Sequence, residues 1–452
     1  MTGPGAVMVG LAIGAGELVI WPWITAKFGA AMVWAAALGV FLQLWVNIEI
    51  GRWAICTGES LFYGYARLWR GFIHIFLLLG VITIFLPAWA RASGSALKAL
   101  IFGPQGPGPD WFWTGLTFAA ICAILLGPKT IYTAVERTVT LLVVIIVLGL
   151  ILVAFRVGTL EHVAEMARGL FNFGHIELDA EFPFHRFFSA VVYAGAGGFA
   201  NLFYIYYLRD KQIGMGGRFP RLMSPLRSQA KAGEQTGYIF TETPPNRRHF
   251  KKWFRYVVLD QTLYFWLLNT FTMFLFMFGA LAVLHPRGIV PEESQLVWDL
   301  ATILTEVMGE PGRYLFLVIG MAALFSSQLA LVDGSGRILT DMLQIDFSFA
   351  RRLTQGDLYL RLVIAIVVVG TASTWFLDFF QVTALGFIFN AALVSGFAMA
   401  VYTPLTLYLN LRHLPPSARP GWLNICMVGL ASLVYGAFAL LCIWNEVVVV
   451  FD

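Results

Sequence analysis

Two short glycine-rich stretches contain the residues of this sequence that could do chemistry. Residues 13–17 read Ile-Gly-Ala-Gly-Glu, residues 194–198 read Ala-Gly-Ala-Gly-Gly, and each stretch lies inside a long apolar segment. A glycine in a helix interior costs about 1 kcal/mol relative to alanine, so clustered glycines indicate places where a helix can be interrupted. The first stretch alone carries a carboxylate, Glu17. Interrupted apolar segments at corresponding positions of two halves are typical of the substrate site of a secondary transporter.

These interruptions predict a cation site built from oxygen ligands. An interrupted helix leaves backbone carbonyls without intrahelical partners, and that end of the helix carries partial negative charge. Carbonyls near Gly14, Gly195 and Gly198, with the Glu17 carboxylate, form a hard-oxygen set suited to Mg²⁺, Ca²⁺, Mn²⁺ or Na⁺. Two simpler interpretations stay open. Gly10 and Gly14 form a Gly-x-x-x-Gly pair that lets helices pack closely, and Glu17 could be a protonated structural residue.

Further polar residues within the apolar segments are candidates for a proton or substrate path. They are Asn201, Gln328, Asp333, Gln381 and Asn390. Ser326 and Ser327 precede Gln328 on the same segment. Hydroxyl and amide groups commonly hydrogen-bond between membrane helices, so a structural role is the simpler interpretation for most of them. Asp333 is a candidate proton carrier, and Arg337, one turn away, offers an ion pair instead.

The elements that must position these residues are membrane helices. The 452 residues are 59% hydrophobic and 12% charged, whereas soluble domains carry roughly 25% charged residues. Apolar runs of about 20 residues predict an all-α protein with eleven transmembrane helices in a single domain, residues 1–452. We place the helices near 3–23, 30–50, 72–90, 111–127, 138–155, 187–208, 259–284, 314–336, 359–377, 381–409 and 422–445.

The distribution of charge predicts the topology. Arginine and lysine concentrate in the loops of one side, including the basic segment 209–256, and the opposite loops are acidic. The positive-inside rule then places the N-terminus inside and the C-terminus outside, in a multi-pass protein of the cytoplasmic membrane without a cleavable signal peptide. No nucleophile–base pair, nucleotide-binding loop or nucleic-acid motif is evident, so we expect no enzyme, no cofactor and no nucleic-acid partner.

The two glycine-rich stretches lie five spans apart, so their helices would have opposite orientations. This predicts an inverted repeat of five plus five helices, with interrupted first and sixth helices. The repeats would cover about 3–155 and 187–409, and an extra helix would follow at about 422–445.

The sequence resembles the Nramp family of proton-coupled divalent metal transporters, which have the LeuT-type fold. The similarity begins with Gly-Pro-Gly at residues 3–5 and continues through Gly29 and Trp34. It includes residues 40–51, Val-Glu-Arg at 135–137, Asn-Leu-Phe at 201–203 and Gln-Val at 381–382. The resemblance implies alternating-access transport in which a metal ion is the cargo and not a resident cofactor.

The signature residues of the family differ here. The family's Asp-Pro-Gly-Asn corresponds to residues 14–17, so glycine replaces the aspartate ligand and Glu17 replaces the asparagine. Its Met-Pro-His corresponds to residues 198–200, and a second histidine corresponds to Ile205. The thioether that favours transition metals is therefore absent. The carbonyl ligand of the sixth helix corresponds to Gly195. The leading prediction is a transporter of a divalent metal such as Mn²⁺ or Mg²⁺; the alternatives are a Na⁺- or H⁺-coupled symporter of a small organic solute and a receptor without transport.

Overall fold

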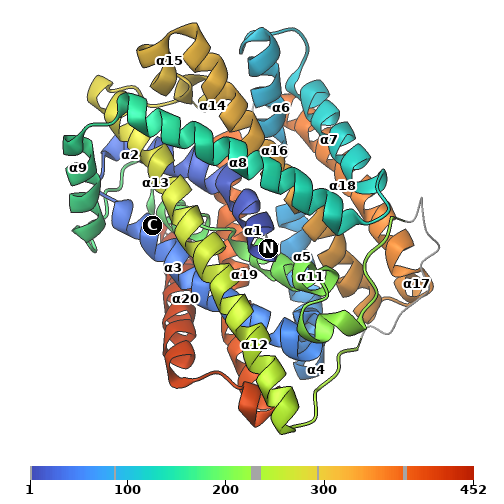
Figure 1. Cartoon of the computed structure of the whole chain (residues 1–452). Helices are drawn as coiled ribbons and strands as arrows, with labels where there is room; N and C mark the ends of the chain where they lie inside the picture. Colours follow the sequence, from blue (N-terminus) through green and yellow to red (C-terminus); the bar gives the residue numbers. More distant parts are fainter. Residues whose placement is uncertain (1–2, 86–87, 225–235, 293–294, 380–383, 452) are drawn as a thin grey trace.

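The computed structural model describes residues 3–85, 88–224, 236–292, 295–379 and 384–451, and they form a helical bundle (Figure 1). Eight helices in these ranges are long and apolar enough to cross a membrane, and two shorter apolar helices accompany them. The chain is therefore an integral membrane protein with several spans, as predicted. The count of eleven spans stays a prediction.

Most predicted spans correspond to a helix, but α6 lies almost entirely outside them. The long elements are α3 (Val33–Thr57), α5 (Gly71–Phe85), α6 (Ala88–Phe102), α7 (Asp110–Leu126), α8 (Ile131–Val157), α16 (Glu310–Asp346), α18 (Gln355–Phe379), α19 (Ala384–His413) and α20 (Trp422–Phe451). A further continuous helix comprises α12 (Pro244–Asp260), η4 (Gln261–Leu268), α13 (Asn269–Gly279) and η5 (Ala280–Leu284). It begins inside the segment 209–256, so the loop predicted there is shorter than expected. Short helices outside the spans are α4 (Leu61–Leu68), α9 (Leu160–Phe171), α14 (Leu296–Leu300), α15 (Thr302–Met308) and α17 (Ser348–Arg351).

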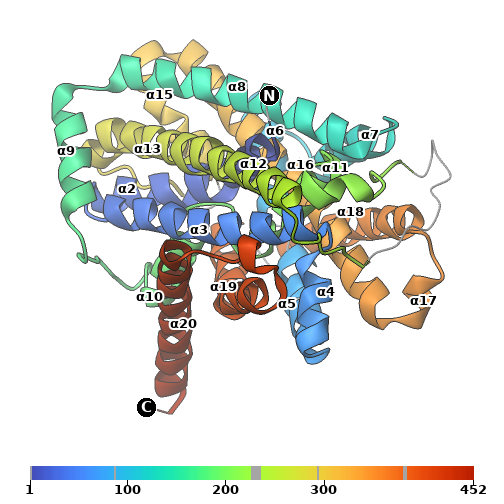
Figure 2. The ribbon, with the colours of Figure 1, turned by 60° about the horizontal axis from the view of Figure 1, so that its bottom comes forward.

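The first helix lies in the centre of the bundle and α20 lies at its edge. The most apolar window of residues 4–28 is 100% buried inside the protein, whereas that of residues 422–445 is 28% buried. Figure 2 shows α20 projecting from the body with the C-terminus at its free end. Leu433, Leu440 and Trp444 are exposed on α20, as expected of a helix surface that faces lipid.

The first helix is not interrupted, so the prediction of a break there is wrong. α1 (Pro4–Ala12), a π-helix η1 (Ile13–Ile20) and α2 (Trp21–Phe28) follow one another directly. The Trp21 N–H donates to the carbonyl of Gly16, five residues earlier. Pro22 provides the physical reason, because it lacks an N–H and its ring would collide with a carbonyl of a regular α-helix. The chain widens its helix ahead of the proline instead of unwinding.

The sixth predicted helix is interrupted, as predicted. α10 (Phe184–Val192) ends before a non-helical segment at residues 193–197, and η2 (Gly198–Leu202) and α11 (Phe203–Asp210) follow. Gly197 has φ +67° and Gly198 has φ +51°, which side chains other than glycine rarely adopt. These two glycines therefore permit the interruption.

Candidate functional site

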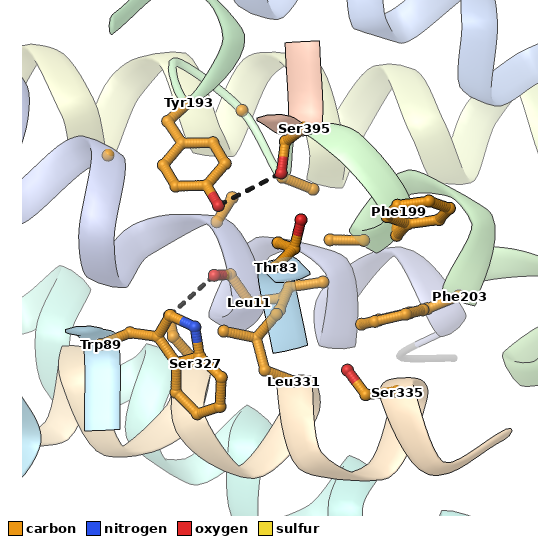
Figure 3. Close-up of a pocket in the computed structure, with 16 residues that line it drawn as sticks. Leu11, Thr83, Trp89, Tyr193, Phe199, Phe203, Ser327, Leu331, Ser335 and Ser395 are labelled. Atoms are coloured by element: carbon orange, nitrogen blue, oxygen red, sulfur yellow. Dashed lines mark hydrogen bonds between the residues drawn. The ribbon is translucent and has the colours of Figure 1, made fainter. Parts of the chain in front are cut away.

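A small cavity lies where η1, the interrupted segment 193–197 and α16 meet (Figure 3). Its volume is about 40 Å³, which accommodates a few water molecules and is far below the roughly 300–1,000 Å³ of a typical ligand pocket. The aromatic residues of its lining are Trp89, Tyr193, Phe199 and Phe203, and its hydroxyl residues are Thr83, Ser327, Ser335 and Ser395. Among the described residues, none that lines the cavity is charged.

The two glycine-rich stretches meet at this cavity. A Cβ atom added to Gly16 would collide with the backbone carbonyl of Tyr193, so glycine is required for the contact. Gly16 and Gly195 both line the cavity. The similarity between the two glycine-rich stretches therefore identified two segments, far apart in the chain, that lie side by side.

Gln43 on α3 stabilises the interruption. Its Nε2 donates to the Val192 carbonyl at 2.8 Å, and its Oε1 accepts from the Gly197 N–H at 2.9 Å. This buried amide replaces hydrogen bonds that the backbone loses where the helix stops. The sequence analysis did not identify Gln43; its only signal is an amide within the apolar run 33–50, which also contains Asn47.

Five oxygens converge where the end of α1 contacts α16. The Gly14 N–H, which would donate to the Gly10 carbonyl in a regular α-helix, donates to Ser327 Oγ at 3.0 Å. The Ser326 hydroxyl contacts the carbonyls of Gly10 at 2.8 Å and Ala323 at 2.9 Å. The Ser327 hydroxyl contacts the Gly10 carbonyl at 3.1 Å. It also contacts the Leu11 carbonyl at 2.7 Å (Figure 3). We call these five oxygens the oxygen cluster. They are the carbonyls of Gly10, Leu11 and Ala323 and the hydroxyls of Ser326 and Ser327.

Glu17 lies outside the lining of the cavity. It is fully buried, and its Oε2 accepts from the Thr272 hydroxyl on α13 at 2.7 Å. Its Oε1 has no hydrogen-bond partner among the described residues. One turn before Thr272, the Asn269 amide donates to the carbonyl of Ala194 at 3.3 Å. Glu17 is thus connected to α13, and α13 is connected to the interrupted segment.

The structure only partly brings the predicted metal ligands together. Gly195 lines the cavity, whereas the Gly198 carbonyl accepts from the Tyr402 hydroxyl on α19 at 2.8 Å. Gly14 contributes its N–H to Ser327 and Glu17 faces α13. Within the described parts of the chain, no group of three or more His, Cys, Asp and Glu residues could hold a metal ion. The metal role of Gly14, Glu17, Gly195 and Gly198 stays a prediction.

The other predicted polar residues have different surroundings. Asn201 donates to the Tyr402 hydroxyl at 3.2 Å, on the side of the interruption that leads into α11. Gln328 is buried, and neither atom of its amide has a partner among the described residues. Asp333 belongs to a buried ion-pair cluster, and Asn390 is exposed. Gln381 lies outside the described residues.

Comparison with known proteins identifies the fold. No family model matches the chain, and no curated protein matches it. A variant of the Eremococcus coleocola manganese transporter matches over 100% of this chain and 87% of that chain, with TM-score 0.65 and 16% identity. Mhp1, a nucleobase-cation-symport-1 family transporter, has TM-score 0.53 and 14% identity over 98% and 91% of the two chains. MhsT in complex with L-phenylalanine has TM-score 0.50 and 16% identity over 97% of each. The chain therefore has the LeuT-type fold of these transporters.

Proposed function

We propose that the chain is a secondary transporter that couples the movement of a small organic solute to Na⁺, with the ion held at the oxygen cluster. The convergence of neutral oxygens from α1 and α16 beside an uncharged cavity carries this proposal. Because Ser327 belongs to both the cluster and the cavity lining, an ion bound at the cluster and a solute in the cavity would share one side chain.

The chemistry of the oxygen cluster favours a monovalent hard cation. Its two hydroxyls have one proton each, while three carbonyls lie within hydrogen-bond distance of them. A cation would accept electron density from all five oxygens without requiring any proton. Mg²⁺ and Ca²⁺ sites normally include carboxylates, and the cluster contains none. Na⁺ needs less charge compensation, so neutral oxygens suffice.

The cavity lining favours an organic solute. Ligand sites combine apolar and aromatic walls with a few placed polar groups, and four aromatic side chains with five hydroxyls, that of Tyr193 included, fit that description. Tyr193 and Ser395, whose hydroxyl oxygens lie 3.4 Å apart, close one side (Figure 3). Mhp1 carries a bound hydantoin and MhsT a bound amino acid, so organic solutes are known ligands on this fold. The cavity would enlarge when the solute enters by alternating access.

Transport of a divalent metal is the second candidate. Of the three structures compared above, the manganese transporter has the highest TM-score. Glu17 supplies a buried carboxylate, one oxygen of which has no partner among the described residues. In this alternative the metal is the cargo, with Glu17 and the carbonyls near Gly14, Gly195 and Gly198 as ligands.

A pair of measurements on purified protein distinguishes Na⁺-coupled solute transport from divalent metal transport. We expect Na⁺, and not K⁺ or choline, to raise the melting temperature of the wild type, and Ser327→Ala to shift this effect to Na⁺ concentrations at least about tenfold higher. Proteoliposomes with a Na⁺ gradient are then screened with labelled amino acids and nucleobases. Saturable Mn²⁺ or Mg²⁺ influx that Glu17→Gln abolishes, without Na⁺ stabilisation, would overturn the proposal in favour of the metal.

A further inference from the structure

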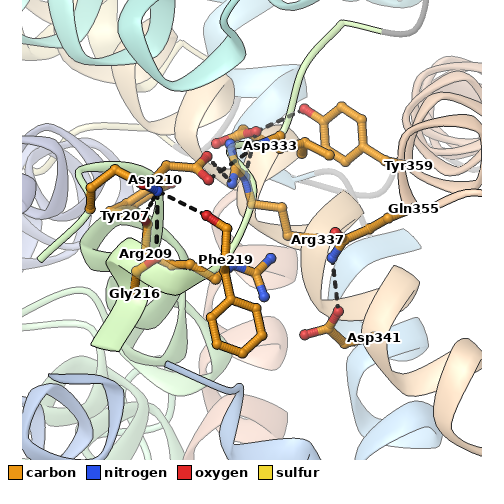
Figure 4. A network of polar contacts seen from close by, with 12 residues as sticks. Tyr207, Arg209, Asp210, Gly216, Phe219, Asp333, Arg337, Asp341, Gln355 and Tyr359 are labelled. Carbon is orange, nitrogen blue, oxygen red and sulfur yellow. Dashed lines mark hydrogen bonds and ion pairs between the residues drawn. The ribbon is translucent and has the colours of Figure 1, made fainter. Parts of the chain in front are cut away.

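A fully buried cluster of charged side chains joins α11, α16 and α18 (Figure 4). Arg337 Nη1 lies 2.6 Å from Asp210 Oδ2 on α11, and Arg337 Nε lies 2.9 Å from Asp333 Oδ1 on its own helix. The Tyr359 hydroxyl on α18 donates to Asp333 Oδ1 at 2.8 Å. The Arg337 side chain is 1% exposed, and those of Asp210 and Asp333 are 0% exposed.

The charges of this cluster do not balance. Two carboxylates face one guanidinium, so the cluster carries a net charge of −1 when all three groups are ionised. Burial of an uncompensated charge is costly, and a bound proton removes it. Asp333 is the member with spare capacity, because its Oδ2 has no hydrogen-bond partner among the described residues.

Charged groups nearby have partners or neighbours outside this cluster. On the adjoining elements, these are Lys211 with Glu136 of α8, Arg67 of α4 with Glu59, His74 of α5 with Asp346, and Arg209 of α11 beside the aromatic rings of Tyr206 and Phe219 and near Asp341. The remaining titratable neighbours are the hydroxyls of Tyr207 and Tyr132. Among the described residues, none of these groups forms an ion pair with Asp210 or Asp333.

The cluster lies at the contact that closes one end of the cavity. Phe203 of α11 and Leu331 and Ser335 of α16 line that end, and Asp210 and Arg337 follow further along the same two helices. A Cβ added to Gly334 would collide with the Phe203 ring, so the helices are in direct contact. Separation of α11 from α16 would break the Asp210–Arg337 ion pair and admit water to all three groups.

We propose that Asp333 binds a proton when α11 closes against α16, so that closure of this end of the cavity is linked to proton uptake. In the closed state the proton neutralises Asp333, so Asp210 alone balances the charge of Arg337. In the open state water solvates both carboxylates and the proton is released. Because the closed state binds the proton more tightly, acidic conditions favour closure. This linkage depends on neither the coupling ion nor the cargo.

The rate of cysteine labelling tests this proposal. The four native cysteines of the full chain are replaced by alanine. Ser335 is 2% exposed, so a cysteine introduced by Ser335→Cys reports opening. Labelling by a maleimide is measured without Na⁺ or solute, and a variant that retains only the exposed Cys426 corrects for the reactivity of the thiol itself. We expect the corrected rate to fall by about tenfold between about pH 8 and about pH 5.

Two substitutions should change this rate in opposite directions. Asp333→Asn, which mimics the protonated state, should give slow labelling at every pH. Asp210→Asn removes the contact between the helices and balances the cluster, so labelling should be fast at every pH. Asp341→Asn is the matched control, since Asp341 is a buried aspartate of the same helix that accepts from Tyr206 instead, and it should retain the pH dependence. Asp333→Glu, which keeps a carboxylate at this position, should show the pH dependence that Asp333→Asn loses.

Persistence of the wild-type pH dependence in Asp333→Asn, or its loss in Asp341→Asn, would overturn the proposal. Because no Na⁺ or solute is present, failure here is distinct from failure of the proposed function. Size-exclusion profiles and melting temperatures identify any variant that does not fold. If Asp333→Asn does not fold, the labelling rates of Asp210→Asn and Asp333→Glu test the proposal instead.

Discussion

The carboxyl group of Glu17 is held by the hydroxyl of Thr272, with Glu17 Oε2 and Thr272 Oγ1 2.7 Å apart. The same hydroxyl lies 3.1 Å from the carbonyl of Leu268 and 3.0 Å from that of Asn269. One hydroxyl proton cannot serve three acceptors at once. The shortage is removed if Glu17 is itself protonated and donates to Thr272, which then donates to a carbonyl of its own helix.

This arrangement predicts that Glu17→Gln is tolerated by the fold. Glutamine retains a donor for Thr272, so we expect a melting temperature close to that of the wild type. Glu17→Ala removes the hydrogen bond between the two side chains and opens a cavity, which should cost about 1–3 kcal/mol for the lost hydrogen bond alone. Chemical denaturation of the two variants provides the comparison. Equal destabilisation by Gln and Ala would instead indicate an ionised carboxylate.

Removal of the Ser327 hydroxyl should weaken Na⁺ binding. Ser327→Ala takes one of five oxygens from the cluster and leaves the Gly14 N–H without its acceptor, so we expect the apparent Na⁺ affinity to fall at least about tenfold, or about 1.4 kcal/mol. Na⁺-dependent melting curves measure the change. Thr340→Ala is the matched control, because this buried hydroxyl of the same helix donates to the Gly336 carbonyl and touches no part of the cluster. A similar loss of affinity in Thr340→Ala would assign the effect to the helix as a whole.

Gln43→Leu should destabilise the interrupted segment. Leucine has nearly the volume of glutamine but leaves the Val192 carbonyl and the Gly197 N–H unpaired and buried, at about 1–3 kcal/mol each. We expect a lower melting temperature and weaker solute binding, because Gly195 and Gly197 line the cavity. Gln43→Glu, which can accept from Gly197 but cannot donate to Val192 when ionised, should fall between leucine and the wild type. A melting temperature unchanged in Gln43→Leu would contradict the role of Gln43.

The sequence was sufficient for most of the spans, but not for α6, and for the pairing of the two glycine-rich stretches, because both depend on composition and on local conformational cost. It was not sufficient for the path of the first helix. Gly14 and Gly16 indicated a break, but Pro22 is compatible with a π-helix, which keeps the backbone hydrogen-bonded. The difference between unwinding and widening depends on contacts with α16 that are about 310 residues away in the chain.

The composition of the site depended on helix rotation, which the sequence leaves open. Glu17 was the strongest chemical signal, yet the widened helix turns it toward Thr272. Ser326 and Ser327 resembled ordinary interhelical hydroxyls until their distances to the Gly10 and Leu11 carbonyls were known. Gln43 carried no signal beyond its polarity, since its importance derives from the positions of two backbone groups about 150 residues away.

The ion pair between Asp179 and Lys27 should make stability depend on acidic pH. The hydrogen bond from Lys27, at 2.8 Å, lowers the pKa of Asp179, which lies in the loop after α9. Because the folded-state pKa is lowered, the contribution is complete above the unfolded value of about 4 and is lost as pH falls through the lower folded value. Melting temperatures of the wild type and Asp179→Asn should therefore differ near neutral pH and converge below about pH 4. A difference that persists at the acidic end would indicate that the carboxylate does not carry the effect.

Gly16→Ala should disrupt the contact between the first helix and the interrupted segment. The added Cβ would meet the Tyr193 carbonyl, a backbone atom that cannot rotate away, so η1 and residues 193–197 would have to separate. We expect a loss of about 1–3 kcal/mol in stability together with loss of solute binding, measured by denaturation and by uptake into proteoliposomes. Gly436→Ala is the matched control, because a Cβ at Gly436 on α20 meets nothing within 4 Å and alanine favours the helix. If Gly16→Ala transports like Gly436→Ala, the two segments do not need their close contact for function.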